Sequence, residues 1–103
     1  MVHPSYDATC FHAQQCAEKY LKARLHEEDV PFGKTHDLVA LLEQILDQEP
    51  AWEEFREDLG YLSDFAVSFR YPGESADRDS ALEAQNRCRA FRRAARHAFG
   101  LPA

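Results

Sequence analysis

Several features that mark whole classes of proteins are scarce or missing in this chain of 103 residues. Glycine and proline number four and five, too few for a collagen-like or low-complexity sequence. No apolar run approaches the ~20 residues of a membrane-spanning helix, and residues 1–10 lack the basic and then apolar segments of a secretory signal. The three cysteines form no CxxC pair, which favours reduced thiols over a disulfide framework. We therefore expect a cytoplasmic protein that does not enter a membrane.

The residues that are present have the composition of one small globular domain. Hydrophobic residues make up 45% and charged residues 29%, so we expect a single domain over residues 1–103 with one core. The net charge of −6 is unevenly spread, because residues 1–86 hold 18 acids and 7 bases, whereas residues 87–103 hold five arginines and no acid. This basic end either interacts with the dipole of a helix terminus or meets a phosphate group, and the sequence leaves both open.

Helical spacing of apolar residues recurs in four segments without any strand-like alternation beside it, so the sequence predicts an all-α fold. The four helices are expected at about residues 5–28, 36–48, 51–69 and 81–99. Thr35 is a suitable N-cap for the second helix, and Ser80 with Glu83 forms a capping box for the fourth. Gly100 and Pro102 are expected to end the fourth helix. The short connections favour an up-and-down antiparallel bundle.

Each expected helix has one apolar face, which we place in the core. The predicted core positions are Cys10, Ala13, Ala17, Tyr20, Leu21 and Arg24 in the first helix, Leu38, Leu41, Leu42, Ile45 and Leu46 in the second, Trp52, Phe55, Leu59, Leu62, Ala66 and Phe69 in the third, and Ala84, Cys88, Phe91, Ala95 and Phe99 in the fourth. Gly60 is expected to bend or weaken the third helix. The three cysteines are expected to pack as small apolar side chains. Cys88, which lies between two arginines, has the most electropositive setting of the three.

Local signatures of metal and nucleophile sites are absent from the sequence. There is no H-E-x-x-H, no paired CxxC and no acidic calcium loop, and neither a G-x-S-x-G elbow nor a glycine-rich phosphate loop occurs. We therefore expect no metal site and no cofactor. The acidic run between Glu53 and Asp58 is typical of a solvated helix face.

Two short segments carry side chains that suit phosphate binding. Residues 34–38 place a cation, a hydroxyl, an imidazole and a carboxylate at a helix start, where free amide groups attract anions. In residues 70–73 an arginine precedes a rigid Tyr-Pro turn. Its guanidinium group is planar and donates hydrogen bonds to phosphate, and the tyrosine ring offers a face on which a base can stack. Residues 34–38 could instead be an ordinary capped helix start. The arginine of residues 70–73 could instead bind carbonyl groups or a carboxylate within the fold at a helix end. The candidate nucleotide- or phosphate-binding residues are Arg70, Tyr71, Lys34 and His36.

Three motifs follow one another along the chain, HAQQCAEKYLKARL over residues 12–25, KTHDL over residues 34–38 and RYPG over residues 70–73. In this order and spacing they resemble the prokaryotic HEPN domain family, over about residues 5–99 of the chain. The resemblance implies an all-α bundle that dimerises and is associated with nucleotide or RNA binding. Many such proteins are encoded beside a small nucleotidyltransferase, as a toxin–antitoxin-like pair. Many relatives also have a further long helix before the first motif, which here lies close to the start of the sequence.

The resemblance implies two rival functions beside a purely structural dimer that binds no nucleotide. The first, which we favour, is a nucleotide- or RNA-associated homodimer that acts with a nucleotidyltransferase partner. The second is a metal-independent ribonuclease, because some HEPN proteins cleave RNA with an arginine and a histidine a few residues later, brought together across the dimer. No histidine follows Arg70 at that spacing, whereas Arg92 and His97 have it. His36 from the other protomer is a further candidate for the general base.

Overall fold

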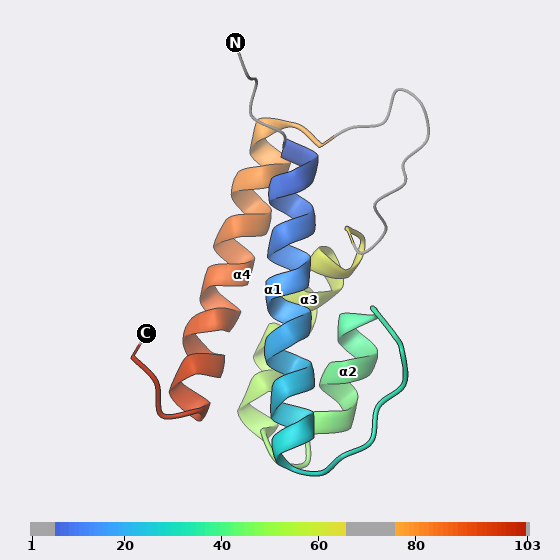
Figure 1. Ribbon diagram of the computed structural model, residues 1–103. Helices are drawn as coiled ribbons and strands as arrows, with labels where there is room; N and C mark the ends of the chain where they lie inside the picture. Colours follow the sequence, from blue (N-terminus) through green and yellow to red (C-terminus); the bar gives the residue numbers. More distant parts are fainter. Residues whose placement is uncertain (1–5, 66–75, 103) are drawn as a thin grey trace.

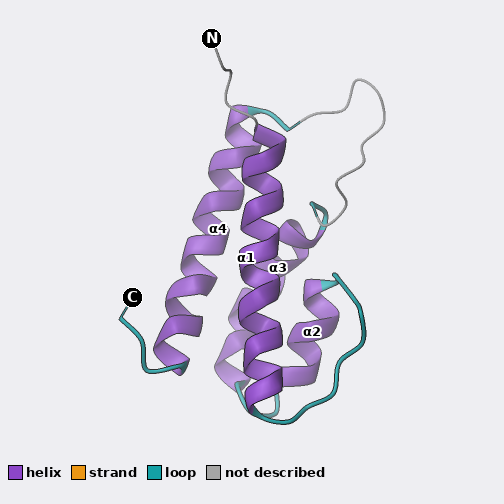
Figure 2. Cartoon of the chain, in the orientation of Figure 1, coloured by secondary structure: helices purple, strands orange, loops and turns teal. Residues whose placement is uncertain are grey.

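The structure is a computed structural model that describes residues 6–65 and 76–102 (Figure 1). Within these residues the chain forms four α-helices and one 3-10 helix, namely α1 (Tyr6–Glu27), α2 (Leu38–Ile45), η1 (Pro50–Phe55), α3 (Arg56–Ser63) and α4 (Arg78–Ala98). The described part of the chain contains helices and loops but no strand (Figure 2), which confirms the predicted all-α bundle. None of its helices is both long enough and apolar enough to cross a membrane.

The two long helices, α1 and α4, lie side by side and run in the same direction (Figure 1). Asp7, near the start of α1, accepts a hydrogen bond from the amide of Ala76 at 2.7 Å, and Tyr20, near its end, contacts the ring of Phe99. The direction of the helices therefore differs from the strictly alternating order that we expected. The cause is the connection over residues 28–37. Its ten residues can extend ~3.3 Å each, enough to run back along the eight residues of α2.

The N-cap of the second helix is Asp37 rather than the predicted Thr35. The Asp37 carboxylate accepts hydrogen bonds from the amides of Val39 and Ala40, at 3.0 and 3.2 Å, and so satisfies two donors of the first turn. The Thr35 hydroxyl instead accepts a bond from the Asp37 amide at 3.0 Å, which holds the turn before the helix. The prediction of Thr35 as the cap was wrong because two suitable capping residues stand close together and the charged one lies at the helix start.

The fourth helix begins earlier than predicted and ends where predicted. Asp77 is its N-cap and accepts a hydrogen bond from the Ser80 amide at 2.7 Å, so the predicted capping box at Ser80 is wrong. Glu83 is free of that role and pairs with Arg87 at 2.8 Å. At the other end Gly100 has a φ of 73°, the left-handed conformation that glycine adopts without strain.

The third predicted helix is divided in two. Residues Pro50–Phe55 form the 3-10 helix η1, and Arg56–Ser63 form the α-helix α3. Gly60 does not interrupt α3. In a 3-10 helix, residues three apart lie on the same side. Trp52 and Phe55 therefore both reach the ring of Phe91 on α4, edge to face, with centroids 5.1 and 5.5 Å away. Apolar spacings of three and four residues suit both helix types, so the sequence pattern did not distinguish them.

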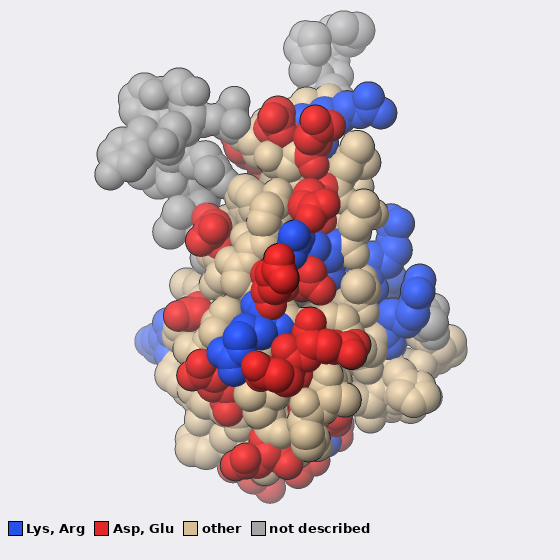
Figure 3. Space-filling model, turned by 180° about the vertical axis from the view of Figure 1, so that it is seen from behind, with Lys and Arg blue, Asp and Glu red and all other residues tan. Residues whose placement is uncertain are grey.

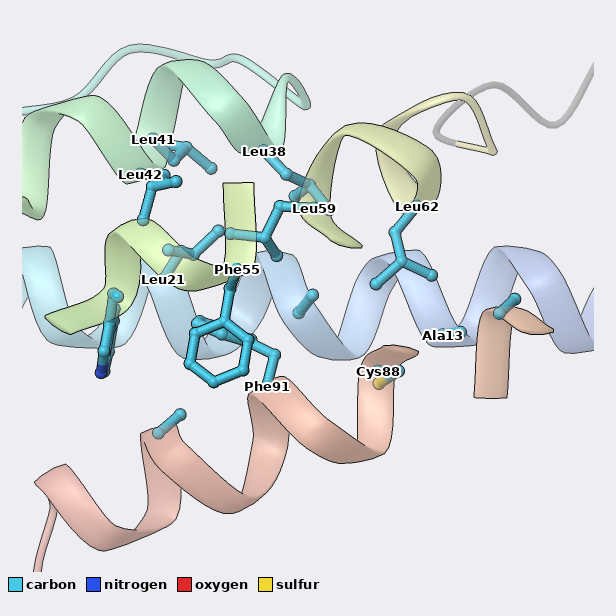
Figure 4. Packing of buried hydrophobic residues seen from close by; sticks show 14 of the residues in the cluster. Ala13, Leu21, Leu38, Leu41, Leu42, Phe55, Leu59, Leu62, Cys88 and Phe91 are labelled. Atoms are coloured by element: carbon cyan, nitrogen blue, oxygen red, sulfur yellow. The ribbon is translucent and has the colours of Figure 1, made fainter. Parts of the chain in front are cut away.

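The core lies between α1 and α4 on one side and α2, η1 and α3 on the other (Figure 4). The predicted core faces are confirmed for most positions, with Tyr20, Leu46 and Phe99 only partly buried. Ala66 and Phe69 lie outside the described residues. The buried hydrophobic residues are Cys10, Ala13, Ala17, Leu21, Leu25, Leu38, Leu41, Leu42, Ile45, Trp52, Phe55, Leu59, Leu62, Ala81, Ala84, Cys88, Phe91 and Ala95. Small side chains predominate between α1 and α4, so these two helices approach closely along their length.

Candidate functional site

Two of the three sequence motifs meet beside the start of α2. Gln14 lies on α1 and is 1% exposed. Its side-chain amide donates hydrogen bonds to Glu18 Oε1 at 2.8 Å and to the backbone carbonyl of His36 at 3.4 Å. Glu18 Oε1 also lies 2.8 Å from Nδ1 of His36, and its other oxygen accepts a bond from Lys22 at 3.2 Å. This network attaches the connection before α2 to α1. His36 therefore already has a partner within the fold, although its side chain remains 66% exposed.

The polar network lowers the pKa of Glu18. Burial alone would raise that pKa, but the hydrogen bonds from Gln14, His36 and Lys22 stabilise the ionised carboxylate and outweigh the burial. The pKa is consequently below the ordinary value of 4.5. Ionised Glu18 thus contributes to the stability of the folded state at neutral pH.

We expect Glu18→Gln to weaken the dependence of the free energy of unfolding on pH at acidic pH. A carboxyl group whose pKa is depressed by folding contributes stability that is present above its unfolded pKa and is lost as the pH falls through its folded pKa. The free energy of unfolding in urea, measured from pH 7 downward, should therefore fall less below pH 4.5 in the variant than in the original protein. Glu54→Gln, on an exposed residue of η1, is the control. Parallel profiles for the protein and the Glu18 variant would contradict this role.

The largest concentration of positive charge lies along α4, on the side away from the core. Four arginines line one hollow of about 280 Å³, and these are Arg89, Arg92, Arg93 and Arg96. Arg96 is used within the fold, because it donates to the carbonyl of Pro102 and to the hydroxyl of Tyr20, at 2.5 and 3.3 Å. The other three form no ion pair with a carboxylate of the described residues. In Figure 3 blue atoms line the edge that α4 forms, whereas on the face beside it red atoms are more numerous than blue ones.

A second hollow, of about 350 Å³, runs between α1 and α4 and shares two of these arginines. It is lined by Thr9, His12, Ala13, Cys16, Gln85, Cys88, Arg89 and Arg92, and we call it the α1–α4 groove. The groove exists because the side chains between the helices are small, as at Ala13 and Cys88, while longer ones rise on both rims. It combines an imidazole, two thiols and two guanidinium groups, and the guanidinium groups are permanently charged hydrogen-bond donors to an anion.

The other arginine of the basic end has a structural role. Arg87 donates to Glu83 and to Asp58 at 2.8 and 2.9 Å, and its guanidinium lies 4.7 Å from the centre of the Tyr61 ring. These contacts tie α4 to α3. The five arginines that the sequence grouped together therefore divide into two with partners in the fold, Arg87 and Arg96, and three without carboxylate partners.

The cysteine whose pKa is lowered is Cys16, although Cys88 also lies close to Arg89 and Arg92. A hydrogen bond from the Cys88 thiol lowers the pKa of Cys16 to about 6, with help from the positive charges of Arg92 and Lys19 and against the effect of burial. The same hydrogen bond and burial raise the pKa of Cys88. Of its neighbours in the sequence, Arg87 is bound to Glu83 and Asp58. The positive charges of Arg92 and Arg89 act on Cys88 but do not outweigh the hydrogen bond and burial.

The structure separates the residues of the predicted catalytic pair. Arg92 lies on the α1–α4 groove, whereas His97 lines a different hollow, of about 620 Å³, beside Trp52 and Phe55. A separation of five residues turns a side chain well around the helix, so one chain does not bring the two groups together. The histidine that does share the hollow of Arg92 is His12, which comes from α1.

The remaining predicted site residues are placed as follows. Lys34 is exposed on the connection before α2, near His36. Arg70 and Tyr71 lie outside the described residues. No group of three or more metal-ligating side chains occurs in the described part of the chain. The assignment of a phosphate site to these residues therefore stays a prediction.

Comparison with models of protein families identifies the family of this chain. The family model of the HEPN domain matches residues 3–98. Because this match covers nearly all of the sequence, the chain belongs to the HEPN domain family, as its three motifs predicted. Searches of curated proteins and of solved structures gave no significant match.

Proposed function

We propose that this HEPN-domain protein binds the phosphates of a nucleotide or an RNA along the α1–α4 groove. The observation that carries the proposal is the set of three arginines, Arg89, Arg92 and Arg93, which lie beside open hollows and have no carboxylate partner among the described residues. A guanidinium group is a planar, permanently charged donor that fits phosphate oxygens in pairs.

The charge of the rest of the molecule favours this groove over other places on the surface. The protein carries a net charge of −6, so most of its surface repels a polyanion. Basic residues elsewhere are largely engaged, as Arg56 is with Glu43 and Glu53 at 2.9 and 2.7 Å. An anion that approaches is therefore directed to the edge formed by α4.

We further propose that the protein acts as a homodimer together with a small nucleotidyltransferase, in a toxin–antitoxin-like system. Membership of the HEPN family supports this part of the proposal. The neighbouring reading frame tests it, because a gene for a small nucleotidyltransferase is expected there, and its product should co-purify with this chain when the two are expressed together. A nucleotidyltransferase that is present but never co-purifies would contradict the partnership.

The RNA-binding part is tested by removing two of the unpaired charges. We expect Arg89→Gln with Arg92→Gln to weaken binding of a single-stranded oligoribonucleotide at least ~10-fold at low salt. The slope of log affinity against log salt should become shallower by about 1.4, since each lost phosphate contact contributes about 0.7. Fluorescence anisotropy over a salt series measures both quantities.

A control variant of equal charge separates local binding from a general charge effect. Arg56→Gln with Arg78→Gln removes two positive charges away from the α1–α4 groove, and it should reduce binding far less than the groove variant. Equal losses in the two variants, or an unchanged salt slope in the groove variant, would contradict the proposed site.

The ribonuclease alternative has one observation in its favour, the position of His12 beside Arg89 and Arg92 in a single hollow. Metal-independent cleavage of RNA needs a base for the 2′-hydroxyl and a cation for the developing charge on phosphate. The same oligoribonucleotide, incubated in chelator and run on a denaturing gel, distinguishes the two functions. We expect it to stay intact. Cleavage that is lost in His12→Ala but kept in His26→Ala would favour the enzyme instead.

A further inference from the structure

We propose that Cys16 and Cys88 form a peroxide-sensitive thiol pair across the α1–α4 groove, which closes reversibly to a disulfide. This modification site is independent of whether the groove binds RNA. The reactive thiol is Cys16, the thiol that closes the bond is Cys88, and the co-reactant is hydrogen peroxide or a small organic hydroperoxide.

The fold brings these two sulfurs together from opposite ends of the chain. Cys16 lies on α1 and Cys88 on α4, and both line the same hollow. The two side chains border this one hollow from neighbouring helices, so their sulfurs face a common space. A disulfide needs Cα atoms about 4.4–6.8 Å apart, and the buried alanines beside the two cysteines, Ala13, Ala17 and Ala84, favour a close approach of α1 and α4. Both cysteines are free thiols in the structure.

The surroundings assign a different role to each sulfur. The groups that face Cys16 are Lys19 and His12 from α1 and Arg89 and Arg92 from α4, all on or beside the groove. Two of them, Arg92 and Lys19, add to the hydrogen bond from Cys88 in lowering the pKa of Cys16 to about 6. Most of Cys16 is therefore thiolate at pH 7, and the thiolate is the form that reacts.

Access also favours Cys16 as the site of attack. Cys16 is only partly buried and opens onto the hollow, whereas Cys88 is 8% exposed. The pKa of Cys88 is raised, so it keeps its proton until a partner is formed beside it. The third cysteine, Cys10, is completely buried and does not line the groove. It therefore provides an internal comparison.

The oxidation of the two thiols by peroxide proceeds in two steps. The Cys16 thiolate attacks one oxygen of the peroxide, the O–O bond breaks, and hydroxide leaves and takes up a proton to become water. Cys16 is thereby oxidised by two electrons to a sulfenic acid. The sulfur of Cys88 then attacks the sulfur of Cys16, the S–O bond breaks, and the proton of Cys88 leaves with the hydroxyl as a second water. Two thiols and one peroxide thus give one disulfide and two waters, and a dithiol reductant reverses the reaction.

The test uses the full chain, treated with one equivalent of hydrogen peroxide and then blocked with an alkylating reagent. Mass spectrometry of the intact protein should show the loss of two hydrogens within one chain, and fragmentation of the linked peptides should place the bond between Cys16 and Cys88. Cys10→Ala should behave like the original protein. Cys88→Ser should stop at a sulfenic acid on Cys16 that dimedone traps, and Cys16→Ser should leave Cys88 reduced.

The pH dependence gives a readout that a merely packed cysteine would not show. The rate of reaction with peroxide should rise to a plateau with a midpoint near pH 6, and Arg92→Gln should move this midpoint upward because it removes a positive charge. Three thiols that remain reduced, oxidation that begins at Cys10, or a bond that forms between two chains would each overturn the proposal.

Discussion

Replacing Phe91 with alanine is expected to destabilise the protein by about 3–5 kcal/mol. Phe91 is completely buried in the middle of α4, and its ring meets those of Trp52 and Phe55 edge to face. The truncation loses the transfer free energy of a whole aromatic ring and leaves a cavity between α4 and η1. The two edge-to-face contacts, each worth about 0.5–1.5 kcal/mol beyond burial, are lost as well.

The measurement is the free energy of unfolding from urea denaturation, followed by circular dichroism. Leu82→Ala is the matched control, because Leu82 lies on the same helix and is 44% exposed. We expect this control to stay within about 0.5 kcal/mol of the original protein. A loss of less than about 1 kcal/mol for the Phe91 variant would show that η1 does not pack on α4 as described.

Arg24→Ala is expected to have the second-largest effect, a loss of about 1.5–3 kcal/mol, the range for hydrogen bonds to charged groups. Arg24 is 8% exposed, at the end of α1, and donates to Glu49 at 3.0 Å, to Glu28 at 2.5 Å and to Glu27 at 3.4 Å. Its removal leaves three carboxylates close together without a cation. The contact with Glu49 also ties α1 to the segment between α2 and η1, so that this connection loses its anchor.

The control for Arg24 is a pair of similar composition on the surface. Arg56 also binds two glutamates, but its side chain is 39% exposed and its partners Glu43 and Glu53 are more than half exposed. Water screens such pairs, so Arg56→Ala should change the stability little. A larger loss for Arg56 than for Arg24 would contradict the assignment of Arg24 as the buried anchor.

The sequence predicted the long helices well, because each has a full apolar face and strong signals at its ends. The helix α1 was expected at residues 5–28 and is found at Tyr6–Glu27. The start of α4 was placed three residues late, since Ser80 and Asp77 are both good caps and only the side chain that reaches the free amide decides between them. The division of the third segment into η1 and α3 has no distinct apolar pattern, and the sequence could not reveal it.

The candidate site was predicted less well than the fold, for a physical reason. The sequence identified the arginines of α4 but not that α1 lies beside them in the same direction. That arrangement depends on the long connection over residues 28–37, whose path is set by the contacts of Gln14 and Glu18 with His36. Only this path places His12 and Cys16 opposite Arg92. The spacing of His12 and Cys16, four residues apart, was the one local signal that both lie on the same face of α1.

Nuclear magnetic resonance of the full protein, titrated with a short oligouridylate at low salt, tests the central claim most directly. We expect the backbone signals of His12, Cys16, Arg89 and Arg92, and the side-chain signals of the last two, to move first and to return as salt is added. Signals around His36 and Lys34 should move little at the same RNA concentration. Shifts confined to the start of α2, or no salt-sensitive shift along the α1–α4 groove, would contradict it.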